Sequence, residues 1–245
     1  MSMSPASELL SWYDQHARIL PWRAKVGQTP DPYHVWLSEI MLQQTTVTTV
    51  KPYFEKFLRL FPTVQDLAAA AEPSVMAAWA GLGYYSRARN LHACARQISR
   101  DFGGKFPETE AALQLLPGIG PYTAAAIAAI AFDQPAAPVD GNIERVLSRI
   151  SADTTPLPAL KKPIKAYNQT LVPAQRPGDF AQAMMDLGSS ICTPKRPNCA
   201  ACPWQNRCQA HQQGIAESLP RRAPKNPSRN ALALCFGWKI MPVRF

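Results

Sequence analysis

The stretch 116–142, LPGIGPYTAAAIAAIAFDQPAAPVDGN, places the strongest constraint on how this chain can fold. Pro117, Gly118 and Gly120 exclude a regular helix at its start, and the two glycines permit positive φ angles. Pro121 suits the first turn of a helix, because the N–H that proline lacks has no partner at that position. The pattern predicts a turn whose backbone N–H groups face a phosphate at a helix N-terminus; the alternative is an ordinary corner between two helices.

Length and charge narrow the class of protein. The chain has 245 residues, enough for one large or two small domains with a buried core, and 47% of them are hydrophobic. Lysine and arginine number 26 against 17 aspartates and glutamates, and the net charge of +9 indicates a polyanionic partner or a basic surface kept for solubility. No apolar run approaches the roughly 18 residues of a membrane span, and no signal peptide is evident. We therefore expect a cytoplasmic protein, nucleoid-associated in a bacterium, with no membrane partner and with reduced thiols.

Helical periodicity dominates the chain, and strand signals are scarce. The predicted helices cover residues 5–17, 33–43, 45–60, 64–70, 73–80, 85–101, 109–115, 121–131, 141–150, 160–171 and 178–189. A Pro-rich basic segment at 216–230 predicts a linker. The residues after it, 231–245, begin like a strand, and we expect the chain to end just inside a further domain.

Four of the six cysteines lie close together in the sequence, as Cys192, Cys199, Cys202 and Cys208. Four thiolates in one loop can hold a [4Fe-4S] cluster or a zinc ion. Zinc sites usually combine two Cys-x2-Cys pairs, and only one such pair is present, so the asymmetric spacing favours the cluster and leaves zinc as the alternative. The loop is also basic, which suits contact with phosphate; otherwise it is a solvated loop around a structural metal.

Several ordered motifs accompany the glycine turn and the cysteines. They are PWR at 21–23, WLSEIMLQQT at 36–45, GLGYYSRARNL at 81–91, LPGIGPYT at 116–123, VDGNIERVLSR at 139–149 and QAMMDLG at 182–188. With these motifs, which extend over about residues 8–210, the chain resembles the helix-hairpin-helix DNA glycosylase superfamily, and within it most closely the adenine-specific branch of the MutY type. The resemblance implies an all-α fold of two helical lobes, with the active site in the cleft between them.

The resemblance also implies how the chain is divided. A six-helix core with the helix-hairpin-helix is expected over about 24–138, and a helical iron–sulfur lobe over about 1–23 plus 139–215, so that the catalytic region spans 1–215. Residues 231–245 would be the truncated start of the domain with which family members recognise 8-oxoguanine. We therefore expect slower or less selective cleavage than an intact enzyme would show.

Cleavage of an N-glycosidic bond needs an acid for the departing base and a carboxylate for the oxocarbenium-like sugar. Glu39 lies at the edge of the apolar stripe of helix 33–43, where desolvation would raise its pKa; the alternative is a solvated surface glutamate. The resemblance implies that Glu39 protonates adenine at N7. Asp140 reads as an N-cap of helix 141–150, and the resemblance implies that it also stabilises the oxocarbenium ion, with Tyr122 and Asn142 organising it and the sugar.

Tyr122 separates two branches of the superfamily. Relatives of the endonuclease III type carry a lysine at this place, which forms a Schiff base with the sugar, and a phenol cannot do so. The resemblance therefore implies a monofunctional enzyme that removes the base and leaves the strand intact.

The base must leave the duplex to reach such a pocket, and other side chains must fill the gap. The resemblance implies that Gln44 and Tyr84 fill this gap as wedge residues, with Thr45 beside them at the DNA. The alternatives are that Gln44 is a polar residue at a helix end and that Tyr84 is a half-buried core tyrosine. The backbone N–H groups of Gly118 and Gly120 would bind phosphate without reading sequence. The resemblance implies an adenine pocket lined by Trp22, Arg23, Leu42, Gln182 and Met185. Taken one at a time, each of these residues would be interpreted as an ordinary core or surface residue.

The resemblance therefore implies a monomeric enzyme of DNA base-excision repair that hydrolyses adenine from pairs with 8-oxoguanine or guanine in double-stranded DNA. One alternative is a glycosylase of the same architecture for thymine or uracil, but close thymine-specific relatives usually lack the acid at the place of Glu39. Another is a non-catalytic iron–sulfur DNA-binding module, and the presence of both Glu39 and Asp140 argues against it.

Overall fold

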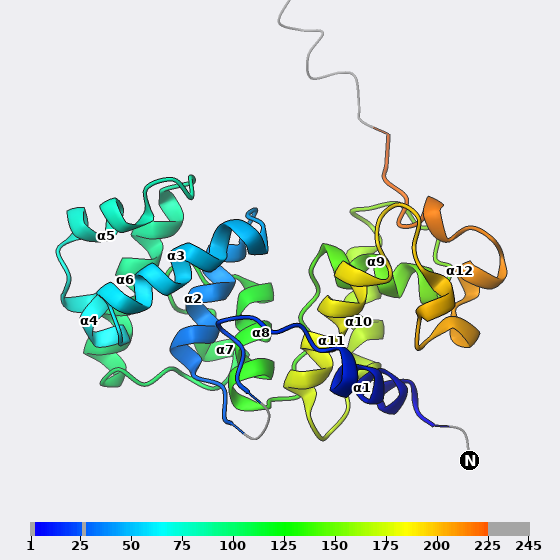
Figure 1. Cartoon of the computed structure of the whole chain (residues 1–245), viewed down its shortest axis with the longest axis horizontal. Helices are drawn as coiled ribbons and strands as arrows, with labels where there is room; N and C mark the ends of the chain where they lie inside the picture. The colour runs from blue at the N-terminus through cyan, green and yellow to red at the C-terminus, as the bar shows by residue number, and fades with distance from the viewer. Residues whose placement is uncertain (1–2, 26–27, 225–245) are drawn as a thin grey trace, which may run out of the picture.

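The computed structural model describes residues 3–25 and 28–224, and that part of the chain is helical, with no named β-strand. The helices of the first lobe are α2 (Pro32–Leu42), α3 (Val47–Leu60), α4 (Val64–Ala69), α5 (Glu72–Trp79), α6 (Ser86–Phe102), α7 (Glu110–Leu113) and α8 (Pro121–Phe132). Those of the second are α1 (Pro5–His16), α9 (Gly141–Ile150), α10 (Lys161–Leu171), α11 (Pro177–Ser190) and α12 (Gln209–Gln212) (Figure 1). The expected all-α fold of two helical lobes is confirmed.

Local capping signals set the helix starts. Asp31 accepts a hydrogen bond from the Tyr33 N–H at 2.8 Å at the start of α2, and Thr63 and Asp66 form a reciprocal capping box at the start of α4. Every predicted helix is present, with ends within two residues of the prediction. The short α12 and the 3-10 turns Cys199–Ala201, Gln205–Arg207 and Ala216–Ser218 were not predicted.

One correction concerns α3, which was predicted from residue 45 and begins at Val47. Gln44 has a left-handed φ of 58°, which a helix cannot contain. Thr46 then caps the helix by accepting a hydrogen bond from the Thr49 N–H. The turn between α2 and α3 is therefore longer than the sequence pattern indicated.

Each lobe has its own hydrophobic core. Trp36, Phe54 and Trp79 are fully buried in the first, whereas Phe180 and Trp204 are buried in the second. Burial of one such side chain contributes about 1.5–3 kcal/mol, so each lobe has an independent source of stability.

The two lobes meet where α8 packs against α11 (Figure 1). A Cβ atom on Gly178 would lie 2.5 Å from the carbonyl oxygen of Ala129, so this close backbone approach requires glycine. The chain crosses between the lobes twice, because α1 belongs to the second lobe although it precedes the first. The Trp204 Nε1–H fixes α1 there by donating to the Pro5 carbonyl at 2.8 Å.

The segment after α12 packs against the second lobe as far as the structure describes it. Leu219 is buried and accepts a hydrogen bond from Arg149 Nε at 3.2 Å, and the Leu157 N–H donates to the Arg221 carbonyl at 2.9 Å. The remainder of the predicted linker and residues 231–245 lie outside the described residues. Within 3–25 and 28–224, no helix combines the length and the apolar character needed to cross a membrane.

Candidate active site and cysteine-lined cavity

Glu39 lies on α2 and lines a pocket to which both lobes contribute. Its exposed fraction is 7%, so the alternative of a solvated surface glutamate is wrong. Burial raises the pKa of Glu39 to about 7, and the charge of Asp140 adds to the rise, whereas the Tyr122 hydroxyl and the Arg23 charge oppose it. A carboxyl that is partly protonated at neutral pH can donate a proton to a leaving group.

The pocket brings together every residue that was expected to bind the base. Its lining includes Trp22, Arg23, Leu42, Gln182 and Met185 beside Glu39. Further residues that were not predicted also line the pocket, namely Arg18, Leu20, Val35, Ser38, Val47 and Ile130. Arg18 and Leu20 lie within three residues before the PWR motif, so the position of that motif was the available signal for them.

Asp186 was also missed, and it anchors the two arginines of the pocket. Its side chain is completely buried on α11 and accepts from Arg23 at 2.6 and 2.8 Å and from Arg18 Nε at 2.5 Å. Burial alone would raise the pKa of Asp186, but the hydrogen bonds and charges of the two arginines hold it below its usual range. This buried ion pair orients Arg23 within the pocket.

Asp140 caps α9, as the sequence pattern indicated. One carboxylate oxygen accepts from the Ile143 N–H at 2.8 Å, and the other accepts from the Asn142 side-chain amide at 2.7 Å. Asp140 is half-buried, and its charge reaches Glu39. The capping bond fixes the orientation of the carboxylate at the start of the helix.

Asn142 is itself held by Arg145. The guanidinium donates to the Asn142 side-chain oxygen at 3.0 Å, to the Gly188 carbonyl at 2.6 Å and to the Cys192 carbonyl at 2.7 Å. A Cβ atom on Gly188 would lie 2.6 Å from that of Asn142, so glycine makes room for the amide. A continuous set of hydrogen bonds thus joins Asp140 to the first of the four clustered cysteines.

The glycine turn leads into α8, which begins at Pro121. Gly118 has a φ of +76°, and a Cβ there would lie 2.8 Å from that of Asn90. Tyr122 follows, and its pKa is raised well above its ordinary value by burial and by the charges of Glu39 and Asp140. Tyr122 therefore lies beside Glu39 as well as Asp140, whereas the resemblance linked it with Asp140 and the sugar alone.

Gln44 and Tyr84 lie in the turns that follow α2 and α5. Both have left-handed backbones, with φ of 58° and 48°, although neither is glycine. Tyr84 is 64% exposed, so the half-buried core position that served as its alternative is wrong. Thr45 follows Gln44, and its hydroxyl donates to the Gln43 carbonyl at 3.3 Å.

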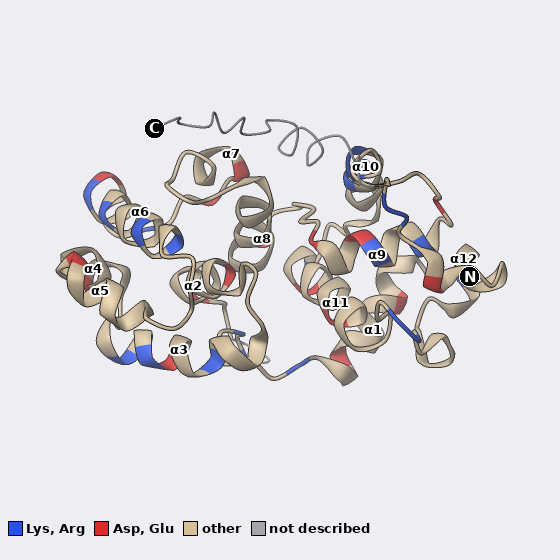
Figure 2. Cartoon of the chain, turned by 90° about the horizontal axis from the view of Figure 1, so that it is seen from above, with Lys and Arg blue, Asp and Glu red and all other residues tan. Residues whose placement is uncertain are grey.

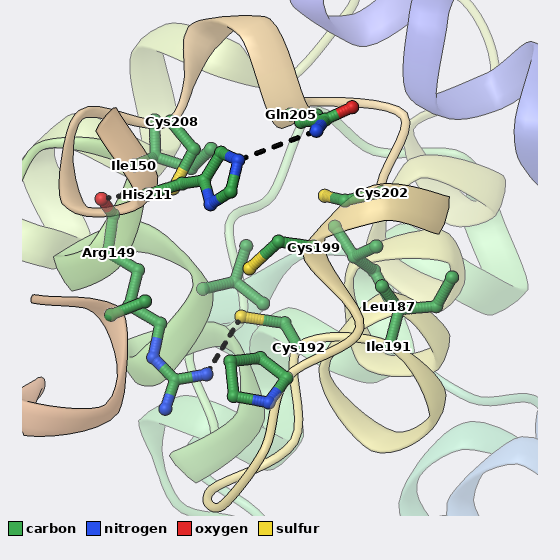
Figure 3. A pocket seen from close by; sticks show the side chains of 13 residues that line it. Arg149, Ile150, Leu187, Ile191, Cys192, Cys199, Cys202, Gln205, Cys208 and His211 are labelled. Atoms are coloured by element: carbon green, nitrogen blue, oxygen red, sulfur yellow. Dashed lines mark hydrogen bonds between the residues drawn. The ribbon is translucent and has the colours of Figure 1, made fainter. Parts of the chain in front are cut away.

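Cys192, Cys199, Cys202 and Cys208 surround one cavity in the second lobe (Figure 3). Arg149 donates to the Cys192 Sγ at 3.3 Å and to the carbonyls of Thr193 and Pro194. Within the described residues, no three His, Cys, Asp or Glu side chains converge tightly enough to hold one metal ion. The fifth described cysteine, Cys94, is buried in the first core, and burial raises its pKa to about 12. Cys235 lies outside the described residues.

Positive charge is distributed along several helices. Lysine and arginine residues recur on α3, on α6 and at one end of α10 (Figure 2). Those on α3 and α10 are Lys51, Lys56, Arg59, Lys161, Lys162 and Lys165. The excess of cationic side chains is thus carried by both lobes that form the pocket.

Several known proteins are similar to this chain in sequence. The adenine DNA glycosylase of Rattus norvegicus is 50% identical over 223 residues, covering 86% of this chain and 43% of that protein. That of Homo sapiens is 49% identical over 218 residues, covering 86% and 40%, and that of Buchnera aphidicola subsp. Baizongia pistaciae is 38% identical over 204 residues, covering 83% and 57%. The chain spans less than two thirds of the length of each of these relatives.

Solved structures and a family model complete the comparison. A thermostable thymine-DNA glycosylase matches with a TM-score of 0.74 at 30% identity, covering 85% of this chain and 95% of that one. An endonuclease III trapped as a covalent intermediate with DNA matches with a TM-score of 0.68 at 20% identity, covering 86% and 95%, which supports the fold. The model described as "HhH-GPD superfamily base excision DNA repair protein" matches residues 37–173. Because that match covers more than half of the sequence, the chain belongs to the HhH-GPD superfamily of base excision DNA repair proteins.

Proposed function

We propose that this chain is the catalytic region of an adenine DNA glycosylase, which acts as a monomer on double-stranded DNA and hydrolyses adenine from pairs with 8-oxoguanine or guanine. The observation that carries the proposal is the buried Glu39, whose pKa of about 7 suits a general acid, within range of the Asp140 charge. Adenine as the target base is supported by the names of the mammalian and bacterial relatives.

In the proposed reaction, Glu39 donates its proton to N7 of the extruded adenine, and the bond between the base and C1′ breaks with both electrons leaving on the base. Asp140 presents its carboxylate to the oxocarbenium ion, oriented by the hydrogen bonds from Ile143 and Asn142. A water molecule then adds to C1′, and its proton returns to Glu39. The ion pair with Asp186 fixes Arg23 in the base pocket.

The chemistry stops at base removal. Tyr122 is held beside Glu39 at the start of α8, and a phenol cannot form a Schiff base with the sugar. No lysine occurs in the glycine turn to replace it. We therefore propose a monofunctional enzyme that leaves an abasic site in an intact strand.

We also propose that Cys192, Cys199, Cys202 and Cys208 hold a [4Fe-4S] cluster, with zinc as the alternative. Four thiolate donors around one cavity fit such a group, and the Arg149 guanidinium beside Cys192 suits its negative charge. The cluster would tie the loop between α11 and α12 to the second lobe. Iron, sulfide and zinc analysis of the purified protein tests this: about four irons and four sulfides per chain are expected, and stoichiometric zinc without iron would refute it.

The function is tested by a single-turnover assay on a labelled duplex that holds adenine opposite 8-oxoguanine, run with and without hot alkali. Strand breaks only after alkali are expected, because base removal leaves an alkali-labile site. Breaks without alkali would mean that an amine attacks the sugar, and the monofunctional assignment would be wrong. The same assay with adenine opposite guanine compares the two proposed partners.

The Glu39→Gln variant distinguishes an enzyme from a DNA-binding module. Glutamine cannot donate the proton, so we expect loss of base release with retained DNA binding. Glu108→Gln, which changes an exposed glutamate, is the matched control and should release adenine normally. Full activity of Glu39→Gln would refute the acid assignment.

A second target base is favoured by one observation, the 30% identity and TM-score of 0.74 to a thymine-DNA glycosylase. Duplexes with thymine or uracil opposite guanine test it in the same assay. Release of thymine or uracil without release of adenine would replace the proposed substrate while leaving the reaction class intact.

A further inference from the structure

Arg87 occupies the space between the two turns that carry Gln44 and Tyr84. It is the second residue of α6 and only 9% exposed. Its Nη1 donates to the carbonyls of Ile40 at 3.1 Å, Met41 at 3.0 Å and Gln43 at 2.6 Å. Its Nη2 lies 3.3 Å from the Thr45 hydroxyl, 3.1 Å from the Leu82 carbonyl and 3.4 Å from the Gly83 carbonyl. One guanidinium therefore bridges the turn after α2 and the turn after α5.

The carbonyls that Arg87 engages lie where helical hydrogen bonding ends, and two of them also have a second donor: the Thr45 hydroxyl donates to Gln43, and the Trp79 Nε1–H donates to Gly83. Ile40 and Met41 lie in the last turn of α2, where carbonyl groups lack intrahelical partners and the helix dipole attracts a cation. Leu82 and Gly83 lie in the irregular turn after α5. Buried carbonyls of this kind need a donor, and a single side chain supplies it to both turns.

Two aromatic rings hold the guanidinium. Its Cζ lies 5.3 Å from the centroid of the Trp79 ring and 5.6 Å from that of Tyr84, within the range of a cation–π contact. Trp79 is fully buried, and its Nε1–H donates to the Gly83 carbonyl at 3.0 Å. Arg87 thus contacts the exposed Tyr84 ring directly and binds both neighbours of Gln44, the Gln43 carbonyl and the Thr45 hydroxyl.

We propose that Arg87 is a positioning residue for base extrusion: it sets the distance between the two turns so that Gln44 and Tyr84 enter the duplex together. The inference rests on the proposed function, which gives these side chains their place in the DNA. Arg87 lies outside the pocket that contains Glu39, so it acts on extrusion and leaves bond cleavage unaffected.

The geometry requires arginine at this position. A guanidinium offers planar donors on two nitrogens, which can face two turns at once, whereas a lysine ammonium is a point charge at one atom. Arg87→Lys would keep the charge and satisfy one turn, but it would not bridge both. Arg87→Met removes the charge and all of the donors while keeping much of the apolar stem.

The experiment follows extrusion and cleavage separately with saturating enzyme. The duplex carries adenine opposite 8-oxoguanine and the fluorescent base 2-aminopurine beside the adenine, so that unstacking raises the fluorescence before the base is released. Arg89→Met is the matched control, because Arg89 is an exposed arginine on the same helix and its loss removes the same charge. A second duplex places the same adenine opposite an abasic site, where no base pair has to open.

For Arg87→Met on the paired duplex, we expect both the rate of the fluorescence rise and the rate of adenine release to fall by about 100-fold. A small misplacement of groups that must be precisely positioned can cause an effect of this size. Arg87→Lys should fall as well, whereas Arg89→Met should match the wild type. On the abasic duplex the release rate of Arg87→Met should be within about threefold of the wild-type rate. No base pair has to open there, so extrusion depends less on Gln44 and Tyr84. Thermal unfolding of each variant shows whether it is folded.

Three results would overturn the inference: a wild-type fluorescence rise in Arg87→Met, a wild-type rise in Arg87→Lys, or an equal loss of release on both duplexes. The last would indicate general damage to the pocket. Failure of the proposed function can be distinguished from failure of this inference. If the wild-type chain extrudes adenine without releasing it, the glycosylase proposal is refuted, but the variants can still be compared by their fluorescence.

Discussion

Replacing Glu39 with glutamine is expected to stabilise the folded protein at alkaline pH while it abolishes base release. Glu39 is buried, and its pKa in the folded state is about 7 against an ordinary value of 4.5. Because each unit of pKa corresponds to about 1.4 kcal/mol, ionising this carboxyl in the folded protein costs about 3 kcal/mol more than in the unfolded chain.

The sign of the pH dependence follows from the protonation of the two states. Below the pKa of the unfolded chain, the carboxyl is protonated in both states and the penalty is absent. As the pH rises toward about 7, the folded protein retains a proton that the unfolded chain has lost, so the free energy of unfolding falls with pH. Above about 7 the full penalty of about 3 kcal/mol is present, and glutamine removes it.

Urea unfolding of the wild type and of Glu39→Gln, followed by tryptophan fluorescence at about pH 5 and about pH 8, measures this difference. The stability advantage of the variant should grow by about 2–3 kcal/mol between the two conditions. Glu108→Gln, at an exposed site, should show no such growth. An advantage that is the same at both pH values would refute the reasoning that burial raises the pKa of Glu39.

Three further predictions concern the same site. Tyr122→Phe removes a hydrogen bond that lowers the pKa of Glu39, so the alkaline fall in the single-turnover release rate, expected near pH 7 in the wild type, should move to higher pH in a pH–rate profile. Gly188→Ala places a Cβ 2.6 Å from that of Asn142, and the release rate should fall by about 10- to 100-fold in the alkali assay. Gly118→Ala forces a side chain into a φ of +76°, which should cost about 1–2 kcal/mol in urea unfolding and weaken DNA binding measured by fluorescence anisotropy.

Each of these has a contradicting outcome. An unchanged pH midpoint in Tyr122→Phe would mean that the phenol does not contact the acid. Normal release by Gly188→Ala would show that the amide beside Asp140 is dispensable. For Gly118→Ala the matched control is Gly120→Ala, where φ is not positive and no atom lies within 4 Å of the added Cβ, so equal effects of the two would contradict the conformational argument.

The helices were predictable from the sequence because their signals are local. Asp31 before α2, the Thr63–Asp66 pair at α4 and Pro121 at α8 each act within a few residues of the helix that they start. The positive φ of Gln44 gave no such signal, since glutamine seldom adopts it, and the start of α3 was misplaced as a result.

Burial of Glu39 was less predictable, because α2 lies in the centre of the first lobe and packs against α3, α6 and α8. A helix buried on several sides also buries the edge of its apolar stripe, and periodicity alone cannot reveal this. The pocket residues were anticipated through the family resemblance, which carries information about packing that a single sequence does not.

Contacts between distant parts of the chain explain what was missed. The partners of Asp186 lie 163 and 168 residues earlier in the sequence, and Arg87 reaches carbonyls more than 40 residues before it. A buried aspartate or arginine at an apolar position shows that a partner is needed, but the partner becomes identifiable only when the fold places the two together.

The placement of α1 has a consequence for the order in which the chain folds during synthesis. Residues 20–136 form the first core as one continuous segment, apart from a single later alanine, so this lobe can fold as soon as its helices leave the ribosome. The second lobe has to wait, because Pro5 accepts its hydrogen bond from Trp204, which is synthesised 199 residues later. Helix α1 therefore remains without these partners until nearly the whole described chain has emerged, and its apolar face is exposed to other molecules throughout that interval.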